Sequence, residues 1–224
     1  MSDSDSFINE VTEEVRRDRL YAMLRRYGWI AVLAIIAIVG GAAFSEYRKA
    51  QVRGTAESLG DSVIAALEQD ESDARADALS AIETDNPGGQ MVTRLLTAAA
   101  QAGSDQTDAA IAALDEAAVI TDLPSIYGEI ARFKALILQA ETSTSDERRL
   151  GFEALAQPGS ALRLLAQEQL ALIDVETGET DAAVARLQDI LVDAEAGPAL
   201  QQRVTQLILA LGGDPALRPD TDQG

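Results

Sequence analysis

The chain has 224 residues, of which 37 are acidic and 18 are basic, so its formal net charge is −19. Such an acidic protein is poorly suited to bind nucleic acid, because proteins contact phosphates through clusters of lysine and arginine. The sequence also lacks histidine and cysteine, which removes the commonest general base and zinc ligand and excludes a disulfide framework.

The first predicted element is a single transmembrane helix at 27–45, a run of nineteen residues without a charge. At about 1.5 Å per residue the helix would be about 28 Å long, close to the hydrocarbon thickness of a bilayer. A buried helix of a soluble protein usually has polar positions at helical spacing, and none occurs from Trp29 to Val39. Aromatic residues suited to the membrane interfaces flank the run: Tyr21, Tyr27 and Trp29 before it, and Phe44 and Tyr47 after it.

Basic residues are more frequent before this run than after it. Short segments rich in lysine and arginine stay on the cytoplasmic side of a membrane. We therefore predict that residues 1–26 form a cytoplasmic tail and that the domain after the helix lies on the far side. The basic residues are Arg16, Arg17, Arg19, Arg25 and Arg26 before the run, and Arg48, Lys49 and Arg53 after it.

A cleavable secretory signal is the alternative interpretation of the same run, with the small residues at 40–43 as its exit. The preceding polar region is 26 residues long and carries six acidic side chains, which is long for a signal sequence. We therefore favour an anchor that is retained in the mature protein.

Small residues interrupt the second half of the predicted membrane helix. Small side chains spaced four residues apart allow the backbone of a second helix to approach closely. They predict a packing face for a partner helix, although in a monomeric anchor the same residues would have no such role. The face consists of Ala37, Gly40, Gly41 and Ala43.

Residues 46–87 are predicted to form a helical connector. Their apolar side chains recur at helical spacing to about Gln69, and again at 74–82 after a polar stretch. The sequence Asn-Pro-Gly-Gly at 86–89 breaks this pattern. We therefore expect the next helix to begin at Met91.

Residues 88–213 are predicted to form one all-α domain, because aromatic residues are sparse and no alternating run of β-branched residues indicates a strand. Turn residues separate the helices, and Gly178 stands where a helix is expected to end. Residues 214–224 are predicted to be a disordered tail. The expected helices cover 91–102, 107–120, 124–140, a short segment ending near 156, 160–177, 181–193 and 199–211.

The expected helix at 124–140 carries most of the aromatic residues of the domain. Tyr127, Arg132 and Phe133 could line a groove, although aromatic residues at helical spacing more often belong to the core. The apolar periodicity predicts that this helix buries Ile126, Ile130, Phe133, Ile137 and Leu138.

Two segments of the domain resemble each other and indicate repeated helix pairs of about 34 residues. Small residues, Ala110 and Ala183, would let the helices of a pair approach, and Leu114 and Leu187 would fill the space between pairs. The segments lie 73 residues apart from Ala110 to Ala183, which leaves room for one unit around 133–155. This spacing resembles the tetratricopeptide repeat and predicts an α-solenoid, although a generic antiparallel α-bundle would show the same pattern.

Closely spaced carboxylates, as at Asp115 and Glu116, are the remaining candidates for chemistry. We interpret them as a solvated face, because neither a neighbouring base nor the residue order of a calcium loop accompanies them. We therefore expect no catalytic, cofactor-binding or metal-binding residues and no small-molecule substrate. A hydrolase that uses carboxylates is the alternative from the enzyme class.

The order of these elements resembles the bacterial YfgM-like family, an ancillary subunit of the Sec translocon. The resemblance covers nearly the whole chain and includes the segments LAQEQLALIDVETGETDAAVARLQDIL and LILALGG. It implies an inner-membrane protein with a periplasmic domain that associates with the SecYEG channel and with periplasmic chaperones. The alternative from another class is a membrane-tethered scaffold for envelope assembly or cell division.

Overall fold

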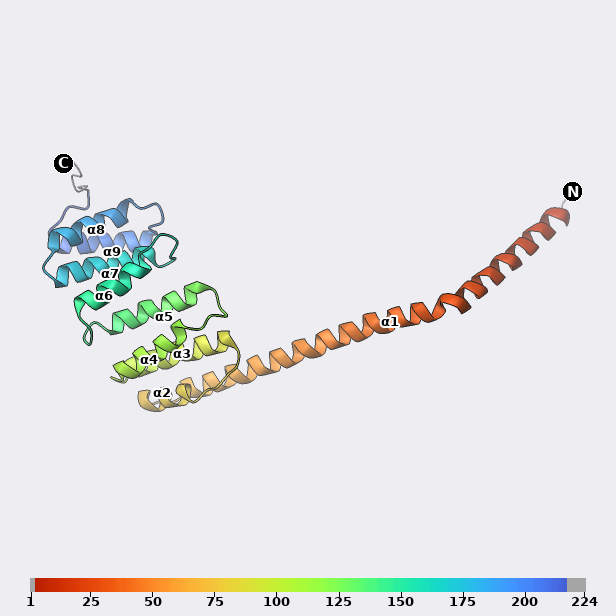
Figure 1. The fold of residues 1–224 in the computed structure, drawn as a ribbon, viewed down its shortest axis with the longest axis horizontal. Coiled ribbons are helices and arrows are strands. Elements are labelled where there is room, and N and C mark those ends of the chain that lie inside the picture. The colour runs from red at the N-terminus through yellow and green to blue at the C-terminus, as the bar shows by residue number, and fades with distance from the viewer. Residues whose placement is uncertain (1–2, 217–224) are drawn as a thin grey trace. The chain divides into compact units, whose positions relative to one another are not determined.

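The computed structural model describes residues 3–216, and every regular element in that range is an α-helix. A long first helix, α1, precedes eight shorter helices, α2 to α9 (Figure 1). The chain divides into two compact units, Met1–Ser58 and Leu59–Gly224, and we call the second unit the helical domain. The prediction of an all-α fold is confirmed for the described residues.

Helix α1, Asp3–Leu67, contains the whole predicted membrane helix and continues beyond it in both directions. The connector predicted at 46–87 therefore falls in both units, because the boundary between the units lies within α1. In the helical domain, Leu59 and Val63 are half-buried and Ala66 is buried. The end of α1 is thus part of the packed domain.

The first helices of the domain pack in the order of the chain, α2 on α3 and α3 on α4. Apolar side chains from α3, including Met91 and Ala98, meet Leu114 and Ala117 from α4 in two buried clusters. These helices are α2 (Ser72–Ser80), α3 (Pro87–Ala102) and α4 (Thr107–Ala118).

The same order continues to the end of the domain, since each helix packs on the one that follows it. Phe133 of α5 and Phe152 of α6 form an edge-to-face pair with ring centroids 5.6 Å apart. The helices are α5 (Ser125–Leu138), α6 (Ser145–Leu155), α7 (Arg163–Glu176), α8 (Thr180–Val192) and α9 (Pro198–Ala210).

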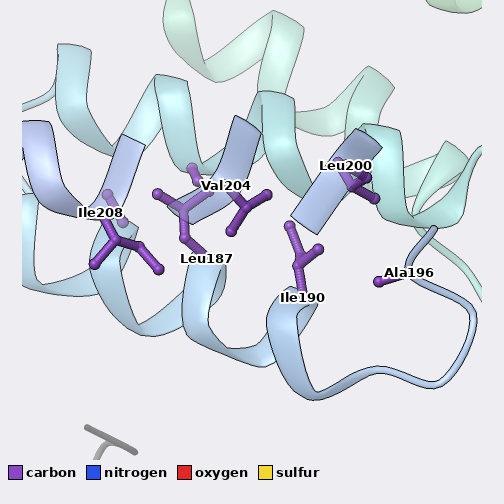
Figure 2. Packing of buried hydrophobic residues seen from close by; sticks show 8 residues of the cluster. Leu187, Ile190, Ala196, Leu200, Val204 and Ile208 are labelled. Atoms are coloured by element: carbon purple, nitrogen blue, oxygen red, sulfur yellow. The ribbon is translucent and has the colours of Figure 1, made fainter. Parts of the chain in front are cut away.

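The core at the C-terminal end of the domain is built from branched side chains. Leu187 and Ile190 of α8 point toward Leu200, Val204 and Ile208 of α9 (Figure 2). Every one of these side chains is buried, so α8 and α9 share a continuous apolar contact. The remaining buried members of the cluster are Ala171, Ala183 and Ala196.

Alanine is prominent in the buried clusters shared by α4 and α5. Ala117 of α4 and Ala131 of α5 share one buried cluster, and Ala110 and Ala135 share another. The prediction that Ile137 is buried is wrong, because its side chain is 42% exposed. Small side chains let two helices approach closely, and the buried residues of α5 are Ala131 and Ala135. Leu138 of α5 also packs against the cluster that contains Ala110 and Leu114 of α4. The other residues predicted to be buried are all half-buried: Ile126, Ile130, Phe133 and Leu138.

The sequence at 86–89 starts a helix, although it was expected only to break one. Helix α3 begins at Pro87, one turn before the predicted start at Met91. The Oδ1 atom of Asn86 accepts a hydrogen bond from the backbone N–H of Gly89 at 2.9 Å. Proline suits the first position of a helix, where its missing N–H has no intrahelical partner to lose. A Cβ atom at Gly89 would lie 2.6 Å from Leu59 Cδ2 and 3.0 Å from Thr84 Cγ2, so a larger residue here would have to displace these side chains.

Replacing Asn86 with alanine is expected to lower the free energy of unfolding by about 1 kcal/mol, because the N–H of Gly89 loses its cap. Urea denaturation followed by circular dichroism measures the change. Asp85→Ala is the matched control, since Asp85 is exposed and caps nothing in the described structure. Equal stability of the two variants would contradict the capping role of Asn86.

Two glycines shape the C-terminal part of the domain. Gly178 directly follows the C-cap of α7 with a φ of +84°, which confirms the predicted end of that helix. A Cβ atom at Gly213 would lie 2.9 Å from Val184 and 3.0 Å from Ile208. In the predicted tail, the backbone carbonyl of Asp214 accepts a hydrogen bond from Gln188 at 2.7 Å. The rest of the predicted tail, 217–224, lies outside the described residues.

Candidate functional site

The apolar run of α1 is a candidate membrane span. In the part of the chain that the structure describes, α1 holds the one helix long and apolar enough to cross a membrane, and none of its apolar window is buried. It is therefore not a core helix of this chain, whereas a signal sequence meets the same criteria of length and composition. The exposed apolar side chains include Trp29, Ile30, Val32, Leu33, Ile35, Ile36, Ile38, Val39 and Phe44.

The predicted packing face lies within this run. Helical geometry places Ala37, Gly40 and Gly41 on one side of α1, with Ala43 at its edge. All four residues are exposed, and a Cβ atom built at Gly40 or Gly41 would meet no atom within 4 Å. The face is therefore accessible to a second helix, and its use by a partner stays a prediction.

A buried carboxylate joins three consecutive helices of the domain. Asp174 of α7 is 1% exposed and accepts hydrogen bonds from Arg149 of α6 and from Arg186 of α8. The Nε atom of Arg186 lies 2.9 Å from Asp174 Oδ2, and its Nη1 atom donates to Gln167 Oε1, also at 2.9 Å. One side chain of α7 thus holds both neighbouring helices.

The two arginines set the ionisation of this carboxyl group. Burial by itself raises the pKa of Asp174, because the charged form loses its hydration. The hydrogen bonds and positive charges of Arg149 and Arg186 lower the pKa, and together they outweigh the effect of burial. The pKa of Asp174 therefore lies below its ordinary value of 3.8.

Further ion pairs link α7 to its surroundings. Arg203 of α9 donates two hydrogen bonds to Glu168 of α7, at 2.9 and 2.7 Å. Arg163, at the start of α7, lies 2.9 Å from Asp193 and 2.6 Å from Glu195 in the α8–α9 loop. The remaining pair is Arg148 of α6 with Glu176 of α7. Helix α7 is thus joined by charge to α6, α8 and α9.

This network is suited to holding helices together and not to moving protons, because arginine keeps its proton at any physiological pH. Asp115 and Glu116, predicted to lie on a solvated face, are exposed. Asp174 and Glu168 are buried, which was not predicted. The signal was available for Asp174, which stands four residues after the buried Leu170 and therefore on the same face of α7.

The three residues of α5 considered for a groove have different surroundings. Phe133 packs against Phe152 and belongs to the core, as its helical spacing favours. Tyr127 is exposed. Arg132 lines a cleft between α5 and α6, together with Glu129 and Leu136. The structure therefore does not gather Tyr127, Arg132 and Phe133 into one groove.

Comparison of the chain with protein-family models, with curated proteins and with solved structures gives no match.

Proposed function

We propose that this chain is a non-enzymatic, membrane-anchored protein whose helical domain binds other proteins. The observation that carries the proposal is the long apolar run of α1, none of which is buried. Apolar surface in water costs about 25 cal/mol per Å², and a bilayer or a protein partner removes that cost. A single retained anchor explains the run with the fewest assumptions.

The domain is proposed to be an α-solenoid of tetratricopeptide-like helix pairs. Support comes from the burial of both matching segments: Ala110, Leu114 and Ala117 in α4, and Ala183, Leu187 and Ile190 in α8. Each helix also packs on the next helix of the chain, as in a solenoid. Solenoids present extended surfaces and commonly use them to bind proteins.

We further propose an inner-membrane location with the N-terminus in the cytoplasm and the helical domain in the periplasm. The partners would be the SecYEG channel and periplasmic chaperones, so that the protein acts as an ancillary translocon subunit. Support comes from the resemblance to the YfgM-like family and from the arginines that precede the apolar run. The alternative partners are proteins of an envelope-assembly or cell-division complex.

Crosslinking in intact membranes, affinity purification of the full chain and mass spectrometry are expected to recover channel subunits and periplasmic chaperones. The matched control replaces residues 27–45 with an unrelated apolar helix of the same length. If the channel is no longer recovered with this control, the membrane helix, which carries the face of Ala37, Gly40, Gly41 and Ala43, takes part in recognition. Unchanged recovery would assign it to the helical domain.

Two results would contradict the proposed translocon role. If neither channel subunits nor chaperones are recovered, the protein does not bind the partners proposed for it. Recovery of envelope-assembly or cell-division proteins in their place would favour the scaffold.

A further inference from the structure

A polar cleft opens in the helical domain between the α2–α3 loop, α3 and the end of α4. None of its lining residues belongs to the ion pairs of α7. Apolar side chains from the loop and from the end of α4 form part of its wall. The lining includes Ile82, Glu83, Thr93, Arg94, Glu116 and Ile120.

One residue that lines this cleft has a buried hydroxyl group without a partner among the described residues. Thr93 is 3% exposed, and within residues 3–216 its hydroxyl oxygen forms no hydrogen bond. Buried polar groups are nearly always paired, because the loss of water without a replacement hydrogen bond is unfavourable. A polar group that entered the cleft and reached Thr93 would remove this cost.

The charges of the cleft favour a cation. Arg94 Nε lies 3.0 Å from Glu116 Oε2, so these two charges compensate each other. Glu83 forms no ion pair with any described side chain and is left as the unbalanced charge of the lining. The surrounding sequence strengthens this field, since residues 54–224 contain 30 acidic and 10 basic residues.

An organic cation fits these groups better than a metal ion. Calcium and magnesium require several oxygen ligands, and the described residues contain no group of three or more acidic, histidine or cysteine side chains that could hold a metal. A guanidinium group instead offers five N–H donors in a plane, which can serve a carboxylate and a hydroxyl oxygen together. Its alkyl stem can pack against apolar residues such as Ile82 and Ile120.

We propose that this cleft binds the side chain of an arginine carried by a partner protein, with Glu83 accepting from its guanidinium group and Thr93 accepting through its hydroxyl oxygen. This inference rests on the proposed function, because the arginine would belong to a protein that the helical domain binds. The cleft would thus recognise one particular side chain of the partner, in a domain whose charged residues are mostly acidic.

The test is a titration of the full chain in detergent micelles with a short peptide that contains one arginine, followed by NMR of the peptide. The control peptide carries citrulline, which has nearly the same shape and no charge. Glu83→Gln is expected to weaken binding of the arginine peptide about tenfold, and Thr93→Val about fivefold. Glu141→Gln changes the net charge equally at an exposed site outside the cleft and should leave binding unchanged.

Two peptide results and one membrane result would overturn the inference, and a further membrane result would overturn only the proposed function. Equal binding of the arginine and citrulline peptides would show that the cleft does not recognise the charge of the guanidinium group. Full affinity of the Glu83→Gln variant for the arginine peptide would show that the peptide binds elsewhere. Thr93→Val has nearly the volume of the natural residue and removes an unpaired hydroxyl, so it is expected to fold. If Glu83→Gln recovers the same partners as the natural chain from membranes, the cleft is not the binding site, while the proposed function stands. If the peptide binds but no partner is recovered, the proposed function fails and the cleft chemistry stands.

Discussion

Replacing Asp174 with alanine is expected to lower the free energy of unfolding of the helical domain by about 3 kcal/mol. The substitution leaves Arg149 and Arg186 without the carboxylate that both of them contact. Removing one partner of a buried ion pair typically costs about 3–5 kcal/mol, and the lower end applies because both arginines are partly exposed and can reach water. Urea denaturation of the full chain in micelles, followed by circular dichroism, measures the loss.

The effect of Asp174 should depend on pH in a defined direction. Its pKa is lower in the folded protein than the ordinary value of 3.8, so the folded state favours the charged form. The stabilisation is therefore complete well above pH 3.8 and is lost as the pH falls through the lower pKa of the folded state. The difference in stability between the natural chain and Asp174→Ala should shrink over that acidic range and stay constant near neutral pH.

Asp122→Asn is the control for this experiment, because it removes one negative charge from an exposed loop residue. It is expected to change stability by less than about 0.5 kcal/mol. A similar loss in Asp122→Asn and in Asp174→Ala would mean that net charge, and not the contacts of Asp174, determines the result.

Replacing Phe152 with alanine is expected to cost about 3–5 kcal/mol, the usual range for a buried aromatic side chain. Phe152 is 2% exposed and lies in a cluster that joins α6 to α7. It also provides the edge-to-face contact with Phe133 of α5. Because the ring fills the space between α5 and α7, its loss should destabilise contacts on both sides of α6.

Hydrogen exchange measured by mass spectrometry locates that destabilisation. Amides of α5, α6 and α7 should exchange faster in Phe152→Ala. Leu150→Ala is the matched control, since Leu150 lies on the same helix and is 69% exposed. Its expected cost is below about 1 kcal/mol. Equal effects of the two substitutions would contradict the assignment of Phe152 to the core.

Much of this fold follows from local patterns in the sequence. Glycine and proline separate the helices of the domain, and the end of α7 at Gly178 agrees with the position predicted from sequence. The start of α3 was missed because proline and two glycines were interpreted as a break. Asn86 was the available signal, since asparagine before proline is typical of a helix start.

Other features depend on how the helices meet, and local patterns do not determine that. Periodicity favours burial of the largest apolar residues, but the buried residues of α5 are Ala131 and Ala135, and Ile137 is exposed. The cleft is a stronger example, because Glu83, Thr93 and Glu116 come from a loop and two helices. Their proximity is a result of tertiary packing, so no spacing in the sequence indicates it.

The alanine contact between α4 and α5 determines which sequences this domain can tolerate. Ala110, Ala117 and Ala131 are fully buried, and a larger residue at any of these positions would have to push two helices apart. The contact between α8 and α9 is made of branched side chains that can be exchanged for others of similar volume. Substitutions in the core are therefore better tolerated between α8 and α9, whereas the alanines between α4 and α5 have to stay small.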